Sequence, residues 1–163
     1  MLGRTYETQN CSAARALELV GERWSLLIIR DALFAGHARF ADFRRSLGVA
    51  PNILAARLDS FVAAGLMERR QYSEHPEQYE YLLTSKGRDL APVIVALTAW
   101  GDQHAAPDGP PIIYQHAACG SEIHQQIRCA ACDEQVRNTD ITVRPGPGLL
   151  PPDPRGDPTA DNR

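Results

Sequence analysis

Four cysteines and a nearby histidine are the side chains of this 163-residue chain with the greatest capacity for chemistry. Cys11 stands alone beside Ser12, where a helix is expected to begin. The N-terminus of a helix lowers the pKa of a thiol and favours the reactive thiolate. Cys11 is therefore a candidate redox-sensing residue, and the alternative is a small, unreactive residue buried beside an interface.

The other three cysteines lie near the C-terminus, in the order His116-x2-Cys119-x9-Cys129-x2-Cys132. Two close pairs of this kind can complete one tetrahedral zinc site, as in a zinc ribbon, and His124 could replace His116. A bound metal would stabilise a module too small to have its own core. Three alternatives stay open: reduced thiols without metal, a disulfide between Cys129 and Cys132, and an ancestral site no longer in use.

An enzymatic function is not expected. Four protein ligands would leave no open position for a metal-bound water. The sequence also has no Gly-x-Ser-x-Gly motif, no glycine-rich phosphate loop and no carboxylate at a diagnostic spacing from the cluster. We predict no catalytic residue and, apart from zinc, no cofactor.

Composition and charge set the class of protein. A hydrophobic content of 44% is ordinary for a chain with a core. The apolar run at residues 26–29 is far shorter than the roughly 20 residues of a membrane span, and residues 1–10 lack the apolar run of a secretory signal. We therefore predict a cytoplasmic protein without a membrane partner. The net charge is −3, but the first 105 residues hold 12 basic and 12 acidic side chains, so the excess of negative charge lies in the remainder.

Hydrophobic spacing predicts the elements that position these groups. Helices are expected at residues 13–20, capped by Ser12, at 24–34, at 40–47, ended by Gly48, and at 51–64, opened by Pro51. Strand-like runs at 66–72 and 78–83 predict a hairpin. This order gives a mainly α fold with a small β-hairpin, which is the plan of a winged helix-turn-helix.

The rest of the chain divides at about residue 106. A long helix over residues 84–103, capped by Thr84 and kinked at Pro92, is expected to end the first domain, residues 1–105. Residues 106–144 are predicted to form a small β-ribbon module resembling a zinc ribbon, with strand-like runs at 112–115 and 141–144. Residues 145–163 are rich in Pro, Gly and Asp and are predicted to be disordered.

A winged helix places its second helix-turn-helix helix in the major groove of double-stranded DNA. On the helix at 51–64, Asn52 can pair with adenine, while Ala55 and Ala56 allow close approach or contact a thymine methyl group. Arginines on neighbouring elements would bind phosphates and set the register, or would simply solvate the surface. They are Arg39, Arg44, Arg45 and Arg57 on the helices and Arg69 and Arg70 on the hairpin.

These motifs, in order, resemble the HxlR-type family (DUF24) of bacterial winged-helix transcription regulators. The resemblance runs through nearly all of residues 11–100. It rests on Cys11, Gly21-Glu22-Arg23-Trp24, Arg39-Phe40, Leu47-Gly48, Leu54, Arg57-Leu58, Ala64-Gly65-Leu66, Tyr81-Leu82-Leu83-Thr84, Gly87 and Trp100.

The resemblance implies a regulator that binds a palindromic operator as a homodimer, built from the first and last helices. An apolar face of the last helix agrees with a dimer of this kind. The alternative is that this face packs on its own domain. The face consists of Leu90, Val93, Ile94, Leu97 and Trp100. Relatives of this type sense oxidants, quinones or aldehydes through a cysteine at the position of Cys11, which implies a reactive effector here. A His-x2-Cys-Gly, a Cys-x2-Cys and a Gly-Pro-Gly also occur in the C-terminal extension of some relatives. The competing function is a protein-docking or dimerisation module with a metal-binding tail and no sequence-specific DNA binding.

Overall fold

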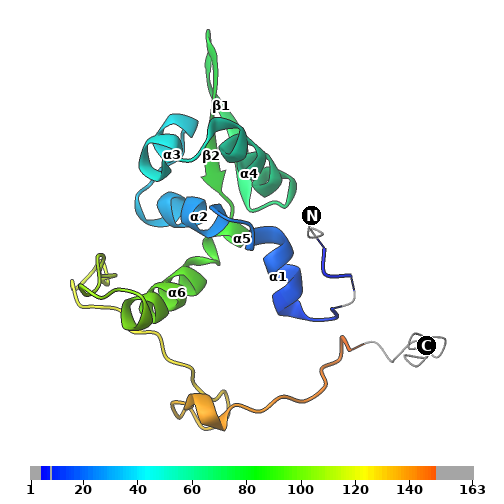
Figure 1. Cartoon of the computed structure of the whole chain (residues 1–163), viewed down its shortest axis with the longest axis vertical. Helices are drawn as coiled ribbons and strands as arrows, with labels where there is room; N and C mark the ends of the chain where they lie inside the picture. Colours follow the sequence, from blue (N-terminus) through cyan, green and yellow to red (C-terminus); the bar gives the residue numbers. More distant parts are fainter. Residues whose placement is uncertain (1–4, 8, 150–163) are drawn as a thin grey trace, which may run out of the picture.

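The computed structural model of the chain describes residues 5–7 and 9–149 (Figure 1). The chain begins with four helices, continues through a two-stranded antiparallel hairpin and ends its folded part with two further helices. In order they are α1 (Ser12–Val20), α2 (Ser25–Phe34), α3 (Phe40–Leu47), α4 (Pro51–Ala63), β1 (Met67–Glu74), β2 (Glu77–Leu83), α5 (Ser85–Arg88) and α6 (Ala91–His104). The predicted winged helix-turn-helix is confirmed. Of the tail predicted to be disordered, residues 150–163 lie outside the described residues.

The core lies where α2, α3 and α4 meet. Ile28 and Ile29 of α2, Phe43 of α3 and Leu54 and Leu58 of α4 are all completely buried. Within α4, Leu54 and Leu58 lie four residues apart and Phe61, which is 1% exposed, lies three further on, so this helix turns one apolar stripe inward. On α2, Leu27 is 39% exposed, whereas the two residues that follow it face the core.

The turn between α3 and α4 follows its sequence closely. Gly48 has a φ of 61°, a left-handed conformation that costs glycine little. Val49 then drops into the core with 3% exposure, and Pro51 opens α4 at a position where no helical N–H is needed. The turn therefore fixes the angle at which α4 leaves α3.

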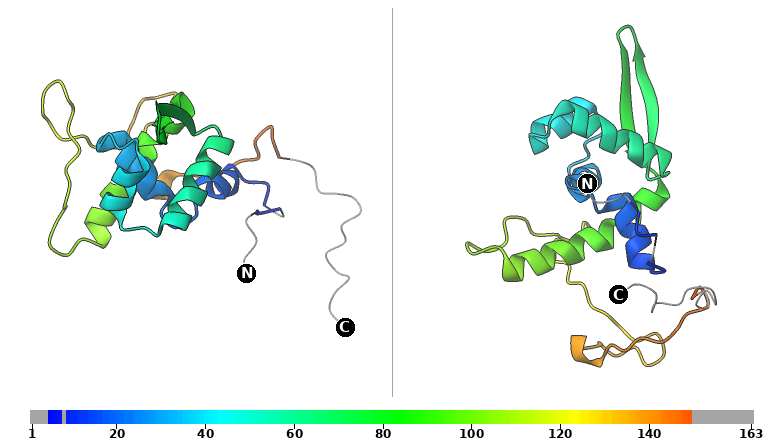
Figure 2. Two further views of the ribbon diagram at one scale, coloured as in Figure 1. Left: turned by 90° about the horizontal axis from the view of Figure 1, so that it is seen from above. Right: turned by 45° about the vertical axis from the view of Figure 1, so that its right-hand side comes forward.

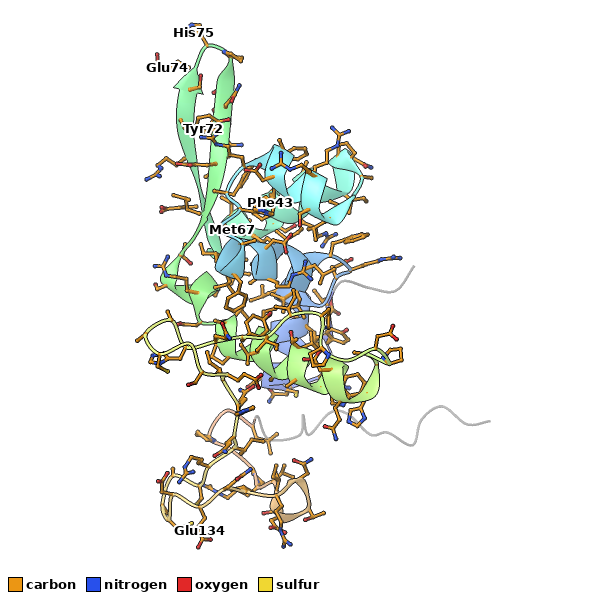
Figure 3. The ribbon with its side chains drawn as sticks, turned by 90° about the vertical axis from the view of Figure 1, so that its left-hand side faces the viewer. Phe43, Met67, Tyr72, Glu74, His75 and Glu134 are labelled. Atoms are coloured by element: carbon orange, nitrogen blue, oxygen red, sulfur yellow. The ribbon has the colours of Figure 1, made fainter. Side chains whose placement is uncertain are left out.

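The hairpin formed by β1 and β2 is the wing. It is anchored by the buried Met67, which pairs with Leu83, and it extends beyond the helices as an isolated two-stranded ribbon (Figures 1 and 2). Figure 3 shows Met67 at its base, Tyr72 part of the way along and Glu74 and His75 at its tip. The strands run further than predicted, so only a short turn separates Glu74 from Glu77.

The long helix predicted after the hairpin is instead two helices. Thr84 caps α5 as expected, since its hydroxyl accepts a hydrogen bond from the Gly87 N–H. The chain then bends at Asp89 and Leu90, and Pro92 lies in the first turn of α6 rather than inside a helix. At the N-terminal end of the domain, Ser12 was predicted to cap the first helix. It is instead the first residue of α1, and Cys11 occupies the capping position.

Residues 106–149, here called the extension, arch beneath α6 toward the side of α1 (Figure 1). The strands predicted at 112–115 and 141–144 are absent from it. Two isolated β-bridges form instead, Gln115 with Glu122 and Arg128 with Gln135. Among the described residues, no helix has the length and apolar character needed to cross a lipid bilayer.

Candidate nucleic-acid interface

The outward face of α4 is small and polar near its N-terminus. Asn52 and Ala56 are exposed and Ala55 is half-buried, whereas Leu54 and Leu58 face the core. Ile53 is also exposed, at 40%, and was missed by the sequence reasoning. Its position next to Asn52 on the first turn could have identified it. Together these side chains give α4 a face that can approach base edges closely, with an amide for hydrogen bonding.

The arginines of α3 lie beside this face. Arg44 is exposed, and among the described residues it has no carboxylate partner within salt-bridge distance. Arg45 is 76% exposed and forms an ion pair with Asp42 at 2.7 Å. Exposed ion pairs of this kind contribute about 1 kcal/mol or less, so phosphate could readily compete for Arg45.

Two arginines stack on tyrosine rings of the wing. The Arg69 guanidinium lies 4.4 Å from the ring centroid of Tyr79, and that of Arg39 lies 4.4 Å from the centroid of Tyr72. Stacking restricts the guanidinium while leaving its N–H donors free for phosphate oxygens. Neither Tyr72 nor Tyr79 was predicted to lie at the interface, although both stand on strands of the predicted hairpin that carries arginines.

Two predicted phosphate-binding arginines have protein carboxylates as partners. Arg70 pairs with Glu80 at 2.6 Å, directly across the hairpin, and Arg57 lies 3.6 Å from Glu22 with only 14% of its side chain exposed. Arg57 therefore does not join the cluster around α3 and points to the segment between α1 and α2. The Arg70–Glu80 pair could have been found from the strand register, whereas the contact to Glu22 is long-range.

The tip of the wing is acidic. Glu74, labelled in Figure 3, pairs with Glu77 across the hairpin, and both side chains are exposed. The hydroxyl of Tyr79 donates to the Glu77 carboxylate, and this bond raises the pKa of Tyr79. Because carboxylates repel phosphate, the surface suited to DNA lies on the lower wing, α3 and α4 rather than on the tip.

A buried carboxylate positions α3 against α2. Asp31 is 4% exposed; it accepts two hydrogen bonds from Arg30, at 2.6 and 2.9 Å, and one from the Ser46 hydroxyl at 2.6 Å. His37 lies 3.7 Å from the same carboxylate. Since Ser46 belongs to α3, this cluster connects the two helices that support α4. It was not predicted, because an aspartate within an apolar run gives no indication of its partner.

The face opposite the wing is apolar. On α1, Leu17 and Leu19 are 47% and 40% exposed, and on α6 Val93, Leu97 and Trp100 are 47%, 51% and 61% exposed. The five residues predicted to form the dimer interface therefore do not all face outward. Ile94 is buried within its own protomer and Leu90 packs on the core. Of the predicted five, Val93, Leu97 and Trp100 remain available to a partner.

Cys11 is an exposed residue at the start of α1. The backbone N–H groups of Ala14 and Ala13 approach its sulfur, and together with the positive charge of Arg15 they lower the pKa of the thiol. This agrees with the expected effect of a helix N-terminus.

The cysteines of the extension are brought together only in pairs. His116 Nδ1 lies 3.2 Å from Cys119 Sγ, and hydrogen bonds from Ser121 and from His116 lower the pKa of Cys119 to about 7. The N–H groups of Cys132 and Ala131 lower the pKa of Cys129 in the same way. Across residues 5–7 and 9–149, no three metal-ligating side chains are grouped closely enough to hold one ion. The four-ligand set is therefore not assembled here, and zinc binding stays a prediction.

Comparisons with known proteins agree with this geometry. A family model described as HxlR-like helix-turn-helix matches residues 19–109. The uncharacterised HTH-type transcriptional regulator Rv3095 of Mycobacterium tuberculosis is 46% identical over 139 residues, which cover 85% of this chain and 87% of that protein.

Two solved structures extend the comparison. PA1607, described as a candidate transcription factor, superposes with a TM-score of 0.75 at 38% identity, covering 85% of this chain and 97% of its own. The reduced form of the redox regulator HypR has a TM-score of 0.53 at 28% identity, covering 57% of this chain and 92% of its own. The similarity to PA1607 reaches into the extension, whereas HypR covers a smaller part of the chain.

Proposed function

The chain belongs to the HxlR-like helix-turn-helix family and is a transcriptional regulator, and from this premise we propose that it binds a palindromic operator as a homodimer through α4, α3 and the wing. One observation carries the proposal. The helix α4, whose N-terminal face is exposed, packs against both α3, which bears Arg44 and Arg45, and β1, which bears Arg69. A groove-reading helix with phosphate-binding side chains on both flanks is the arrangement that a duplex requires.

Each group has a distinct role in this proposal. Asn52 pairs with adenine, while Ile53, Ala55 and Ala56 contact thymine methyl groups or allow close approach. Arg44 and the stacked Arg69 bind phosphates on either side of the groove. We assign Arg57 to the protomer itself, because its guanidinium already pairs with Glu22.

The dimer would bury the exposed apolar side chains of α1 and α6. Leu97 and Trp100 are more than half exposed, which is costly for large apolar groups gathered on one face. A two-fold axis beside α6 would place two copies of α4 on one side of the dimer, and half-sites about one helical turn apart would then match them.

Fluorescence anisotropy with DNA from upstream of the protein's own gene tests the proposal. Arg44→Ala and Arg69→Ala should weaken binding to every sequence and reduce the slope of log K against log salt by about 1 each. Asn52→Ala should weaken binding to the operator and leave non-specific binding nearly unchanged. Arg137→Ala, an equal loss of charge on the extension, is the matched control.

Two results would count against DNA recognition. Equal losses for Arg44→Ala and Arg137→Ala would show that only net charge matters. The absence of a complex at low salt, with any duplex, would favour the protein-docking alternative.

We also propose that Cys11 couples DNA binding to oxidants or electrophiles. The lowered pKa and the exposure of its thiol favour attack on such compounds, and HypR, a redox regulator, is similar over 57% of this chain. Operator release by diamide or a quinone should occur with the unsubstituted chain and be lost in Cys11→Ser. If Cys11→Ser still releases DNA, the sensing proposal fails.

A further inference from the structure

The extension contains the same turn twice, thirteen residues apart. His116 in the first turn corresponds to Cys129 in the second, and Cys119 corresponds to Cys132. In the first turn the Gly120 N–H donates to the His116 carbonyl at 2.8 Å, and in the second the Asp133 N–H donates to the Cys129 carbonyl at 2.9 Å. The local sequences, His-Ala-Ala-Cys and Cys-Ala-Ala-Cys, differ only at the first position.

The hydrogen bonds that close each turn also correspond. The His116 N–H donates to the Ser121 carbonyl at 2.8 Å, and the Cys129 N–H donates to the Glu134 carbonyl at 3.0 Å. One isolated β-bridge follows at the same place in each turn. The extension is thus built from two equivalent turns, and each carries two potential metal ligands at its first and fourth positions.

Backbone conformation strengthens the correspondence. Gly120 and Asp133 occupy the same place in their turns, and both have left-handed backbones, with φ of 72° and 56°. Aspartate is one of the few non-glycine residues that accepts this conformation. The carboxylate of Asp133 is also held by Arg128 at 2.8 Å across the turn. Asp133, which stands where the first turn has Gly120, therefore keeps the same backbone conformation in the second turn.

The turns present their ligand atoms as pairs. His116 Nδ1 and Cys119 Sγ are 3.2 Å apart, close to the roughly 3.5 Å that separates nitrogen and sulfur ligands of one tetrahedral zinc ion. In the second turn the side chain of Cys132 and the backbone N–H groups of Cys132 and Ala131 lie near the Cys129 sulfur. Both arrangements suit a sulfur that bears negative charge, as a zinc-bound thiolate does.

The extension lacks an apolar core that could hold it together. Between residues 107 and 149 no residue is buried, and only Tyr114, Cys129 and Val136 are half-buried. Ile123 and Ile127 remain about half exposed, at 46% and 55%. A segment with defined turns and no core needs another source of stability, and a metal cross-link provides one directly.

We propose that one zinc ion bound by His116, Cys119, Cys129 and Cys132 joins the two turns of the extension. Each turn supplies one preformed half of the tetrahedral shell, and the short connection at residues 124–126 allows the halves to close on the metal. On binding, the three thiols release three protons and His116 binds as a neutral imidazole through a ring nitrogen. Four protein ligands make this a structural site.

The first turn also contacts the winged helix, so the metal would stabilise more than the extension. Tyr114 packs on Phe34 of α2 with ring centroids 4.7 Å apart. Ile113 and Ile123, with Val95 and Ala99 of α6, line a cavity of about 410 Å³. Closing the two turns would fix one wall of this cavity beside the helix that carries the exposed Trp100.

Metal analysis of the full chain, purified without chelator, tests the proposal. About one zinc per chain is expected, with most of it lost in Cys132→Ser and His116→Ala and none lost in Cys11→Ser. His124→Ala should keep its zinc, which distinguishes His116 from the other histidine of the extension. Replacement by Co²⁺ should give the intense visible bands of a tetrahedral site and the near-ultraviolet charge transfer of cobalt thiolate, both absent in Cys132→Ser.

Limited proteolysis gives a second readout that does not depend on DNA binding. Trypsin should cut at Arg128 and Arg137 far faster after chelation, leaving the winged helix intact because its core is separate. Three results would overturn the proposal: well under one metal per chain, an unchanged metal content in Cys132→Ser, and a mass that reveals a Cys129–Cys132 disulfide in the purified chain.

Discussion

Replacing Asp31 by alanine tests whether a buried carboxylate holds the helix-turn-helix in place. The side chain of Asp31 is 5% exposed and contacts Arg30 of its own helix and Ser46 of α3. Asp31→Ala removes the only charged group that connects α2 and α3 among the described residues. We therefore expect a loss of stability much larger than an exposed carboxylate would give.

The magnitude follows from the individual contacts. The Ser46 bond to a charged, buried acceptor is worth about 1.5–3 kcal/mol. The Arg30 pair contributes less, about 1 kcal/mol or below, because the Arg30 side chain is 31% exposed and water screens the interaction. The sum for Asp31→Ala is about 2–4 kcal/mol, whereas Ser46→Ala, which removes the Ser46 bond and leaves the Arg30 pair intact, should cost about 1.5–3 kcal/mol.

Urea denaturation followed by circular dichroism, at one fixed protomer concentration, measures these losses. Asp59→Ala on the exposed face of α4 is the matched control and should change the free energy of unfolding by less than about 0.5 kcal/mol. A double-mutant cycle between Asp31 and Ser46 should give a coupling of about 1.5–3 kcal/mol, the value of their hydrogen bond. If Asp31→Ala costs no more than Asp59→Ala, the assignment of Asp31 as the connection between α2 and α3 is refuted.

Three further predictions concern separate features. Gly87→Ala should destabilise the domain by about 1–3 kcal/mol, because an added Cβ would lie 2.1 Å from the Leu66 carbonyl oxygen; an unchanged urea midpoint would contradict this. Leu97→Asp should yield monomers in sedimentation at micromolar concentration, whereas Val143→Asp on the extension, where the side chain is 97% exposed, should leave the dimer intact. Alkylation of Cys11 by iodoacetamide should reach half its maximal rate at a lower pH in the folded protein than in urea. The reason is that the N–H groups at the start of α1 lower the pKa of the Cys11 thiol. Equal midpoint pH values in the two conditions would disprove this effect.

Most of the winged helix could be predicted from local pattern. The stripe of Leu54, Leu58 and Phe61 indicated which face of α4 is buried, and all three are at most 1% exposed. Gly48 and Pro51 marked the turn between α3 and α4, since each acts through its own backbone. Where a residue's own conformation or spacing decides the outcome, the sequence was sufficient.

The division between α5 and α6 could not be predicted in this way. Helical spacing continues through the break, and only Pro92 indicated an interruption. The break occurs where Leu90 turns back to the core and Gly87 packs against the Leu66 carbonyl, and both contacts join segments distant in sequence. The same long-range packing buries Ile94, so the apolar face predicted to bind a partner is narrower than its spacing indicates.

The candidate interface shows the same limit. Sequence alone identified Asn52 on the outward face of α4 and located arginines on both sides of it, because periodicity fixes which way a helical residue points. It could not show that Arg44 is exposed whereas Arg57 forms an ion pair with Glu22. Nor could it show that the Arg69 guanidinium stacks on the ring of Tyr79. A cation's partner depends on which charges and rings the fold brings within a few ångströms, and that proximity is set by tertiary packing rather than by position in the chain.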